Sequence, residues 1–292
     1  MKGDAMTKLL YLECTSGISG DMCAAALLDA GASEEAVRRA LESLPVEGFA
    51  VEISRVKKSG LDVCDFSVVL DAAHENHDHD MAYLHGHGGA SEHGHDHDRD
   101  RDHGRAHDRD HAHGAPGGHH HRGPAEIAQI IDGAAMTDGA KAIAHRMFGF
   151  VADAEARAHG VPVGEVHFHE VGAVDSIADI IAIAVAADDL APDGVVVSDL
   201  PCGYGTVRCQ HGLIPVPAPA TAFIAEAAGL TLSPVDVEGE LVTPTGAAAA
   251  AALRTEAALP ERFSIKAIGM GAGKRAYDTP GILRAMIIEP AE

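Results

Sequence analysis

The sequence predicts an α/β protein, with a mixed α+β arrangement as the alternative, in which helices pack on a mixed β-sheet. Three observations support this fold class. Short apolar runs typical of strands alternate along the chain with longer amphipathic segments typical of helices. The hydrophobic 46% of the composition is mainly Ala, Val, Ile and Leu, and aromatic residues make up only 4%. The 292 residues are also enough to bury a substantial core.

The first part of the chain is expected to contain three strands and two helices. A buried-type strand (LLYLEC) is followed by a helix (GDMCAAALLDAG) that ends at Gly31, and by a second helix (SEEAVRRALESLP) capped by Ser33. A hairpin of two strands then turns at Lys58-Ser59-Gly60. In order, these elements are residues 9–14, 20–31, 33–45 and 49–70.

The second part begins with a helix whose first turn contains Pro124. A longer amphipathic helix follows and is closed by Gly160. The expected helices are residues 125–134, 137–160, 176–190, 220–229 and 243–255, and the expected strands are residues 194–200, 263–273 and 282–289.

Between these parts lies a segment of very different composition, which we interpret as a disordered, His- and Asp-rich metal-binding insertion over residues 71–123. It contains 15 of the 20 histidines and eleven acidic residues, with almost no apolar side chains to offset the entropy of ordering. The predicted organisation is therefore one α/β domain, with its first part in residues 1–70 and the remainder in residues 124–292.

Clustered imidazoles with carboxylates between them bind late first-row divalent ions such as nickel, copper and zinc. The spacing of the insertion histidines would let a flexible chain wrap around an ion. The alternative is a solvated linker without function. The metal-ligand candidates of the insertion are His77, His79, His93, His95 and His97.

Charge and composition exclude several classes of protein. The net charge of −22 argues against binding to nucleic acid or to an anionic membrane surface. Five widely spaced cysteines without a C-x-x-C pair predict a reducing compartment rather than a disulfide framework. The start of the sequence has no apolar segment of signal-peptide length, and no apolar run reaches 18 residues. We therefore expect a cytoplasmic protein.

The stretch VHFHE is a candidate catalytic and metal-binding motif. If it is extended, His167 and His169 face one side, and Glu170 faces the other. Two imidazoles on one face provide half of a metal site, which Asp175 or Glu170 could complete. The structural alternative is that Asp179 only caps the next helix, in a capping box with Ser176. The pattern alone does not decide between these readings.

Three further motifs suit an anionic ligand. The loop TSGISGDM follows a strand and opens a helix, so its backbone N–H groups could bind phosphate, although its acidic residue also suits the helix dipole. The stretch EGELVTPTG places two threonines at another helix start, where they could cap the helix or bind phosphate. A Gly-rich turn, GMGAGKR, supplies two cations that are alternatively only solvated. The candidates are Ser16, Gly17, Ser19, Gly20, Asp21, Thr243, Thr245, Lys274 and Arg275.

Cys209 and His211 stand two residues apart, before a proline-rich loop. A thiolate and an imidazole together suit nickel, copper or zinc. A buried cysteine beside a hydrogen-bonded histidine is the structural alternative.

Taken in series, the motifs resemble one known family. Five stretches have the order and approximate spacing found in the LarC family of nickel insertion proteins. They are LYLECTSGISGDM, EARAHGVPVGEVHFHEVGAVDSIADI, CQHGLIPVPAPAT, EGELVTPTGAA and IGMGAGKR. Members of that family also commonly contain a His-rich insertion. The resemblance implies insertion of nickel into pyridinium-3,5-bisthiocarboxylic acid mononucleotide. The implied reaction is a CTP-dependent cyclometallation, assisted by Mn²⁺ or Mg²⁺, that makes the nickel-pincer cofactor of lactate racemase.

The resemblance also suggests roles and partners. His167, His169 and Glu170 are the candidates for nickel ligand and for the base that removes a ring proton. Members of the family continue into a C-terminal domain associated with CTP, whereas this sequence ends at Glu292. Either a separate C-terminal subunit supplies that domain, or this sequence is a truncated or split member. The other expected partners are lactate racemase or a related enzyme as cofactor recipient, and further copies of this chain in a homo-oligomer.

Two other functions are considered. The first is a non-catalytic, His-rich nickel store or metallochaperone, in which the insertion performs the whole function. The second is a metal-dependent hydrolase that uses His167 and His169 to activate water. Deletion of the insertion discriminates among them, because an enzyme would keep its chemistry and a store would lose its function.

Overall fold

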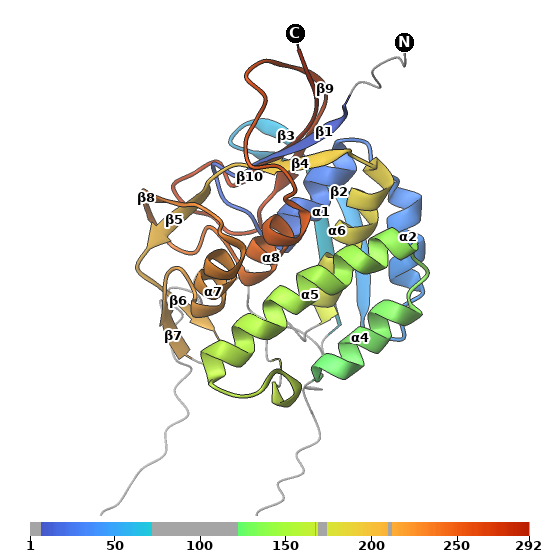
Figure 1. Cartoon of the computed structure of the whole chain (residues 1–292), viewed down its shortest axis with the longest axis vertical. Coiled ribbons are helices and arrows are strands. Elements are labelled where there is room, and N and C mark those ends of the chain that lie inside the picture. Colours follow the sequence, from blue (N-terminus) through green and yellow to red (C-terminus); the bar gives the residue numbers. More distant parts are fainter. Residues whose placement is uncertain (1–6, 72–121, 167, 169–173, 210–211, 292) are drawn as a thin grey trace, which may run out of the picture.

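The computed structural model describes residues 7–71, 122–166, 168, 174–209 and 212–291. Its centre is a six-stranded mixed sheet with the strand order β2-β3-β9-β10-β1-β4 (Figure 1). Strand β1 runs antiparallel to β10 and parallel to β4, and β3 runs parallel to β9. The strands are β1 Leu9–Glu13, β2 Phe49–Lys58, β3 Leu61–Leu70, β4 Gly194–Val197, β9 Phe263–Ala272 and β10 Ile282–Pro290.

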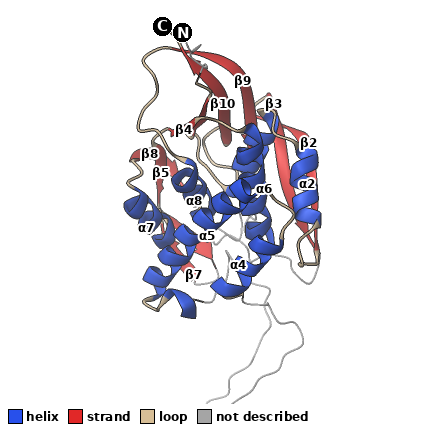
Figure 2. Ribbon diagram, turned by 45° about the vertical axis from the view of Figure 1, so that its right-hand side comes forward, coloured by secondary structure: helices blue, strands red, loops and turns tan. Residues whose placement is uncertain are grey.

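The helices gather on one face of this sheet (Figure 2). Helix α1 packs directly on β3, β9 and β10, α6 packs on α1 and α2, and α5 forms an outer layer over α6, α7 and α8. The helices are α1 Gly20–Asp29, α2 Glu34–Glu42, α4 Pro124–Gly133, α5 Asp138–His159, α6 Val174–Leu190, α7 Pro219–Ala228 and α8 Pro244–Leu253. The predicted class, helices on a mixed sheet, is confirmed.

Side chains alternate along β1 between two apolar clusters. Leu10 and Leu12 face the helices and are fully buried in the main core. Leu9 faces the other way and packs with Met286 and Ile288 of β10 in a smaller cluster. This period of two is what a strand imposes on its side chains, and it explains why every residue of LLYLEC could be apolar or partly buried.

Two small sheets lie beside the main one. Strand β5 Leu200–Tyr204 pairs in parallel with β8 Leu232–Glu238, and β6 Thr206–Cys209 pairs antiparallel with β7 Gly212–Pro215. The sequence prediction had treated these segments as parts of a strand and a loop. Their importance here is that β6 reaches the pocket described below.

Local sequence signals place most of the helix ends. Ser33 accepts a hydrogen bond from the backbone N–H of Ala36 at 3.2 Å, as a capping residue should. Thr137 caps α5 in the same way, and Gly160 closes that helix in the left-handed conformation with a φ of 66°. The predicted caps at Ser33 and Gly160 are confirmed.

Two predictions about local structure are wrong. Helix α6 begins at Val174 rather than Ser176, so Asp179 lies in the second turn and does not complete a capping box. The strand predicted over residues 263–273 is confirmed as β9, so Gly269 and Gly271 belong to that strand and not to the glycine-rich turn that GMGAGKR also suggested. A Cβ on Gly271 would lie 2.0 Å from the carbonyl oxygen of Met22, so glycine there lets α1 lie directly on the sheet.

The sheet combines strands from both sides of the His-rich insertion. Cys64 of β3 is paired with Gly271 of β9, although the insertion separates these strands in the sequence. Residues 72–121 of the insertion lie outside the described residues, and the division into residues 1–70, 71–123 and 124–292 stays a prediction. Among the helices that the structure describes, none is long and apolar enough to cross a membrane.

Candidate functional site

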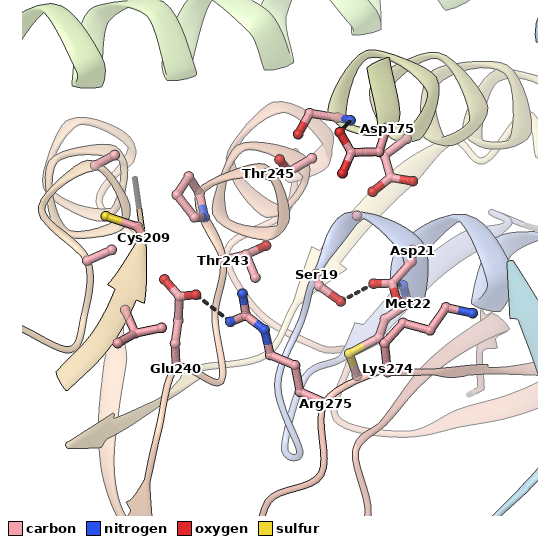
Figure 3. A pocket seen from close by; sticks show the side chains of 18 of the residues that line it. Ser19, Asp21, Met22, Asp175, Cys209, Glu240, Thr243, Thr245, Lys274 and Arg275 are labelled. Carbon is pink, nitrogen blue, oxygen red and sulfur yellow. Dashed lines mark hydrogen bonds and ion pairs between the residues drawn. The ribbon is translucent and has the colours of Figure 1, made fainter. Parts of the chain in front are cut away.

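A pocket of about 390 Å³ opens where helices α1, α6 and α8 begin (Figure 3). The end of α5, the start of α7, parts of β3, β6 and β7, and the loop after β9 also line it. The site candidates that line it are Ser16, Ser19, Gly20, Asp21, Asp175, Cys209, Thr243, Thr245, Lys274 and Arg275. Sequence motifs far apart in the chain therefore converge on one cavity.

The starts of α1 and α8 are held side by side by backbone hydrogen bonds. The N–H of Ile18 donates to the carbonyl of Leu241 at 2.9 Å, and the N–H of Thr243 donates to the carbonyl of Ile18 at 3.2 Å. A Cβ on Gly17, whose φ is 112°, would lie 2.4 Å from the carbonyl oxygen of Leu241. Gly17 thus serves the close approach of the two chains, and it is not among the residues lining the pocket.

One wall of the pocket is acidic. Asp21 is only 8% exposed, and its Oδ1 accepts hydrogen bonds from the Ser19 hydroxyl and from the backbone N–H of Met22. Asp175 and Asp179 reach the same wall from the first two turns of α6. Burial raises the pKa of Asp179 well above its usual value, and the charges of Asp21 and Asp175 raise it further.

The two cations predicted to bind an anion are both paired with carboxylates. The Lys274 ammonium group donates to Asp65, and the Arg275 guanidinium lies 2.5 Å from Glu240, whose side chain is buried. Figure 3 shows the Arg275–Glu240 pair between Thr243 and the loop after β9. An anionic ligand that used these cations would have to displace or share a carboxylate.

The two threonines at the start of α8 have different roles. The Thr243 hydroxyl accepts a hydrogen bond from the N–H of Gly246 at 3.1 Å, so Thr243 is the helix cap. Thr245 is only 7% exposed and lines the pocket, and its side chain makes no hydrogen bond within the described part of the chain. Its hydroxyl is therefore available to a ligand.

The remaining wall carries groups that sequence reasoning missed. Glu155 and His159 stand one helical turn apart near the end of α5, and both line the pocket with Cys209. The Nε2 of His159 is 3.4 Å from the Glu155 carboxylate. Burial raises the pKa of Glu155, while His159 opposes that change. The i, i+4 spacing of Glu155 with His159, and of Asp175 with Asp179, was the signal that could have found these pairs.

Several predicted ligands lie outside the described residues, so their assignments stay predictions. They are His77, His79, His93, His95, His97, His167, His169, Glu170 and His211. Asp175 and Cys209 are described, and Figure 3 shows them on opposite sides of the pocket. Across the described ranges, no three His, Cys, Asp or Glu side chains are arranged so that they could hold a metal ion by themselves.

Cys209 differs from the other cysteines near the helices. Cys14 and Cys23 are free thiols inside the core, and burial raises the pKa of the Cys14 thiol to about 12. Neither is suited to act as a thiolate ligand. Cys209 is half-buried at the end of β6 and opens on the pocket, so it is the better placed sulfur.

Fold and pocket define an α/β protein with a carboxylate-rich pocket between helix starts. The chain belongs to the nickel insertion protein family, whose family model matches residues 10–292. This membership confirms the resemblance to the LarC family drawn from the motifs. A comparison with solved structures gives no significant match.

Relatives carry more specific names. A protein of Alkaliphilus metalliredigens named pyridinium-3,5-bisthiocarboxylic acid mononucleotide nickel insertion protein is 46% identical over 97% of this chain and 61% of its own length. A protein of Geobacillus kaustophilus with the same name is 37% identical over 97% of this chain and 60% of its own length. A putative nickel insertion protein of Geobacter sp. is 38% identical over 98% of this chain and 62% of its own length. The chain thus spans about three fifths of the relatives it matches.

Proposed function

We propose that this chain inserts nickel into pyridinium-3,5-bisthiocarboxylic acid mononucleotide, as part of a CTP-dependent nickel chelatase of the lyase class. The observation that carries the proposal is the match of nearly the whole chain to relatives named for that substrate. The pocket supports it, because about 390 Å³ lies within the usual range for small-molecule sites. Nickel is the cargo of this reaction, and the nucleotide is its acceptor.

The polar groups of the pocket suit the parts of such a substrate. The hydroxyl of Thr245 and the start of α8 would bind the phosphate, since a helix N-terminus favours an anion. Arg275 would exchange part of its contact with Glu240 for the phosphate or for a thiocarboxylate. Cys209 offers nickel a sulfur ligand from which the ion can pass to thiocarboxylate sulfur.

The chemical step replaces a ring proton with nickel. The ring carbon gives up its proton to a base and forms a bond to nickel(II), while two thiocarboxylate sulfurs donate electron pairs to the same ion. No change of oxidation state is needed. His167, His169 and Glu170 are the proposed nickel ligands and base, with His211 as a further nickel ligand.

The wider setting is also part of the proposal. CTP with Mn²⁺ or Mg²⁺ would act through a C-terminal domain on a separate subunit, and lactate racemase or a related enzyme would receive the cofactor. We propose that the protein works as a homo-oligomer in the cytoplasm. The insertion histidines, with His77, His79, His93, His95 and His97 among them, would raise the local concentration of nickel.

A reconstitution experiment tests this function. The chain is incubated with Ni²⁺, the mononucleotide substrate, CTP and Mg²⁺, with and without the separately produced C-terminal region of the Alkaliphilus relative. We expect a nickel-containing nucleotide in mass spectra once that region is added. If the complete relative makes the product and the mixture does not, this chain is not the nickel-inserting part.

The second candidate is a nickel store, which the 15 histidines of the insertion favour. A variant lacking residues 72–121 separates the two functions, because β3 ends at Leu70 before that segment and α4 begins at Pro124 after it. An insertase lacking the segment should still form product at saturating nickel and lose efficiency only at low nickel. Complete loss of both nickel binding and product formation in the correctly folded variant would favour the store.

A further inference from the structure

Three carboxylates on the acidic wall have no assigned role in the proposed reaction. Asp21 comes from the first turn of α1, and Asp175 and Asp179 come from the first two turns of α6. The charges of Asp21 and Asp175 act directly on Asp179 and disfavour its ionised form. Like charges gathered inside a protein destabilise it unless a proton or a cation compensates them.

The helix dipole explains only part of this arrangement. A carboxylate in the first turn of a helix is stabilised by the N-terminal end of the dipole, which accounts for Asp21 and Asp175. That effect falls off within one turn, and Asp179 lies in the second turn of α6. A purely structural explanation therefore leaves Asp179 facing two acidic groups without a compensating gain.

An independent observation concerns one oxygen of Asp21. The Oδ2 atom is buried and has no hydrogen-bond partner among the described residues, whereas Oδ1 of the same carboxylate has two. Leaving a buried carboxylate oxygen without a partner costs free energy, so native proteins rarely do it without a functional reason. The Asp21 side chain is 8% exposed and lies at the pocket wall.

Gly20 provides the space that the Asp179 carboxylate occupies. A Cβ on Gly20 would lie 2.2 Å from Oδ2 of Asp179, so the Asp179 carboxylate lies against the backbone at the start of α1. Any side chain at this position would push Asp179 away from Asp21. Lys274 is the cation that lowers the pKa of Asp179, but its ammonium group already donates to Asp65.

We propose that Asp21, Asp175 and Asp179 bind a hard divalent cation, Mg²⁺ or Mn²⁺, beside the substrate pocket. A donor set made only of oxygens suits these ions, and Mg²⁺ is commonly held by one or two carboxylates together with water and ligand phosphate. In the described part of the chain these three carboxylates are not arranged to hold an ion by themselves, so the bound ligand would have to complete the site. This ion goes beyond the proposed function, because it is distinct from the nickel cargo and is bound by this chain rather than with CTP on the C-terminal domain.

The test is a titration of the full-length chain with Mn²⁺, followed by electron paramagnetic resonance. It is done alone and with nicotinic acid mononucleotide, a pyridinium nucleotide with a carboxylate and a phosphate. The variants are Asp179→Asn and Asp21→Asn, and the control is Asp62→Asn, which removes an exposed carboxylate paired with Arg55 on β2. The His-rich insertion is present in every protein, so its background binding is the same.

We expect the wild type and the Asp62→Asn control to bind one Mn²⁺ that Mg²⁺ displaces. Each cluster variant should bind that ion at least tenfold more weakly, since even outer-shell changes weaken metal sites by about 10–100-fold. Without metal, Asp179→Asn should melt at a higher temperature than the wild type, because it removes like-charge repulsion. A merely structural Asp179 would instead make this variant melt lower.

Identical Mn²⁺ titrations for the wild type and both cluster variants, with and without the mononucleotide, would overturn the proposal. Because Asp21 and Asp179 belong to different helices, a folding defect in one variant leaves the other as a test. The result is also separable from the proposed function. A Mn²⁺ site that ignores the mononucleotide would support the cation site while opposing a nucleotide substrate.

Discussion

At the residue scale, a few glycines decide how closely the elements approach each other. Gly271 of β9 lies under α1, where an added Cβ would be 2.0 Å from the carbonyl oxygen of Met22. Gly149, in the middle of α5, has open space around its missing Cβ. The same residue type therefore performs a packing role at one position and none at the other.

Replacing Gly271 by alanine should lower the free energy of unfolding by about 1–3 kcal/mol, because it overpacks the contact between helix and sheet. The matched control is Gly149→Ala, which should raise that free energy by about 0.5–1 kcal/mol, because alanine favours a helix. Urea unfolding followed by circular dichroism measures both. Equal effects of the two substitutions would contradict the packing role of Gly271.

The carboxyl group of Glu155 gives a pH dependence with a definite sign. Burial raises its pKa in the folded chain above its value in the unfolded chain, which is about 4.3. The folded chain therefore binds the proton more tightly, so this group favours folding most at low pH. Its contribution is lost as the pH rises from about 4.3 through the raised folded pKa.

The variant Glu155→Gln should be more stable than the wild type at pH 7, by up to about 1 kcal/mol, with the difference shrinking toward pH 4. Thermal melts at several pH values measure it. His159 lies 3.4 Å from the Glu155 carboxylate, so its effect on the stability has to be separated from that of Glu155. For this reason Glu155→Gln is compared with the double variant that also carries His159→Gln. A difference that grows toward acidic pH would mean that the pKa shift has the opposite sign.

At the element scale, sequence predicted what depends on neighbouring residues. The caps at Ser33 and Gly160 and the hairpin turn at Gly60 follow from local backbone chemistry, and the structure has them. The start of α6 was misjudged because Ser176 and Asp179 imitate a capping box. The glycines of β9 lie inside the predicted strand 263–273, but they also resembled a turn, because the helix that they accommodate lies far away in the sequence.

The candidate site was partly predictable, because some of its residues belong to local sequence motifs. Ser19, Asp21, Thr245 and Arg275 belong to short motifs at helix starts or loops, and the structure brings them into one pocket. Asp179 was assigned to its own helix, because nothing local reveals that Gly20 leaves room for it. Such a partnership depends on how α1 and α6 pack, and one sequence does not encode that packing in a short pattern.

At the scale of the whole molecule, the order of the strands was beyond sequence reasoning. The alternation of strands and helices predicts the class of fold, but it does not tell that β1 lies between β10 and β4. Leu9 is opposite Ile288 on one side and Gly194 on the other. The part of the chain before the insertion therefore shares its sheet and its core with the part after it.

This shared core predicts the behaviour of a cleaved chain. If a protease cuts within residues 72–121, the two fragments should stay associated, because β3 pairs with β9, β1 pairs with β10 and β4, and α1 packs on β9. Burial of the Leu10 and Leu12 side chains between fragments adds about 1.5–3 kcal/mol each. We expect the fragments to elute together in size-exclusion chromatography and to separate only in denaturant, with one unfolding transition. Fragments that elute apart in native buffer, or that melt separately, would mean that the two parts fold as independent units and that the predicted single α/β domain is wrong.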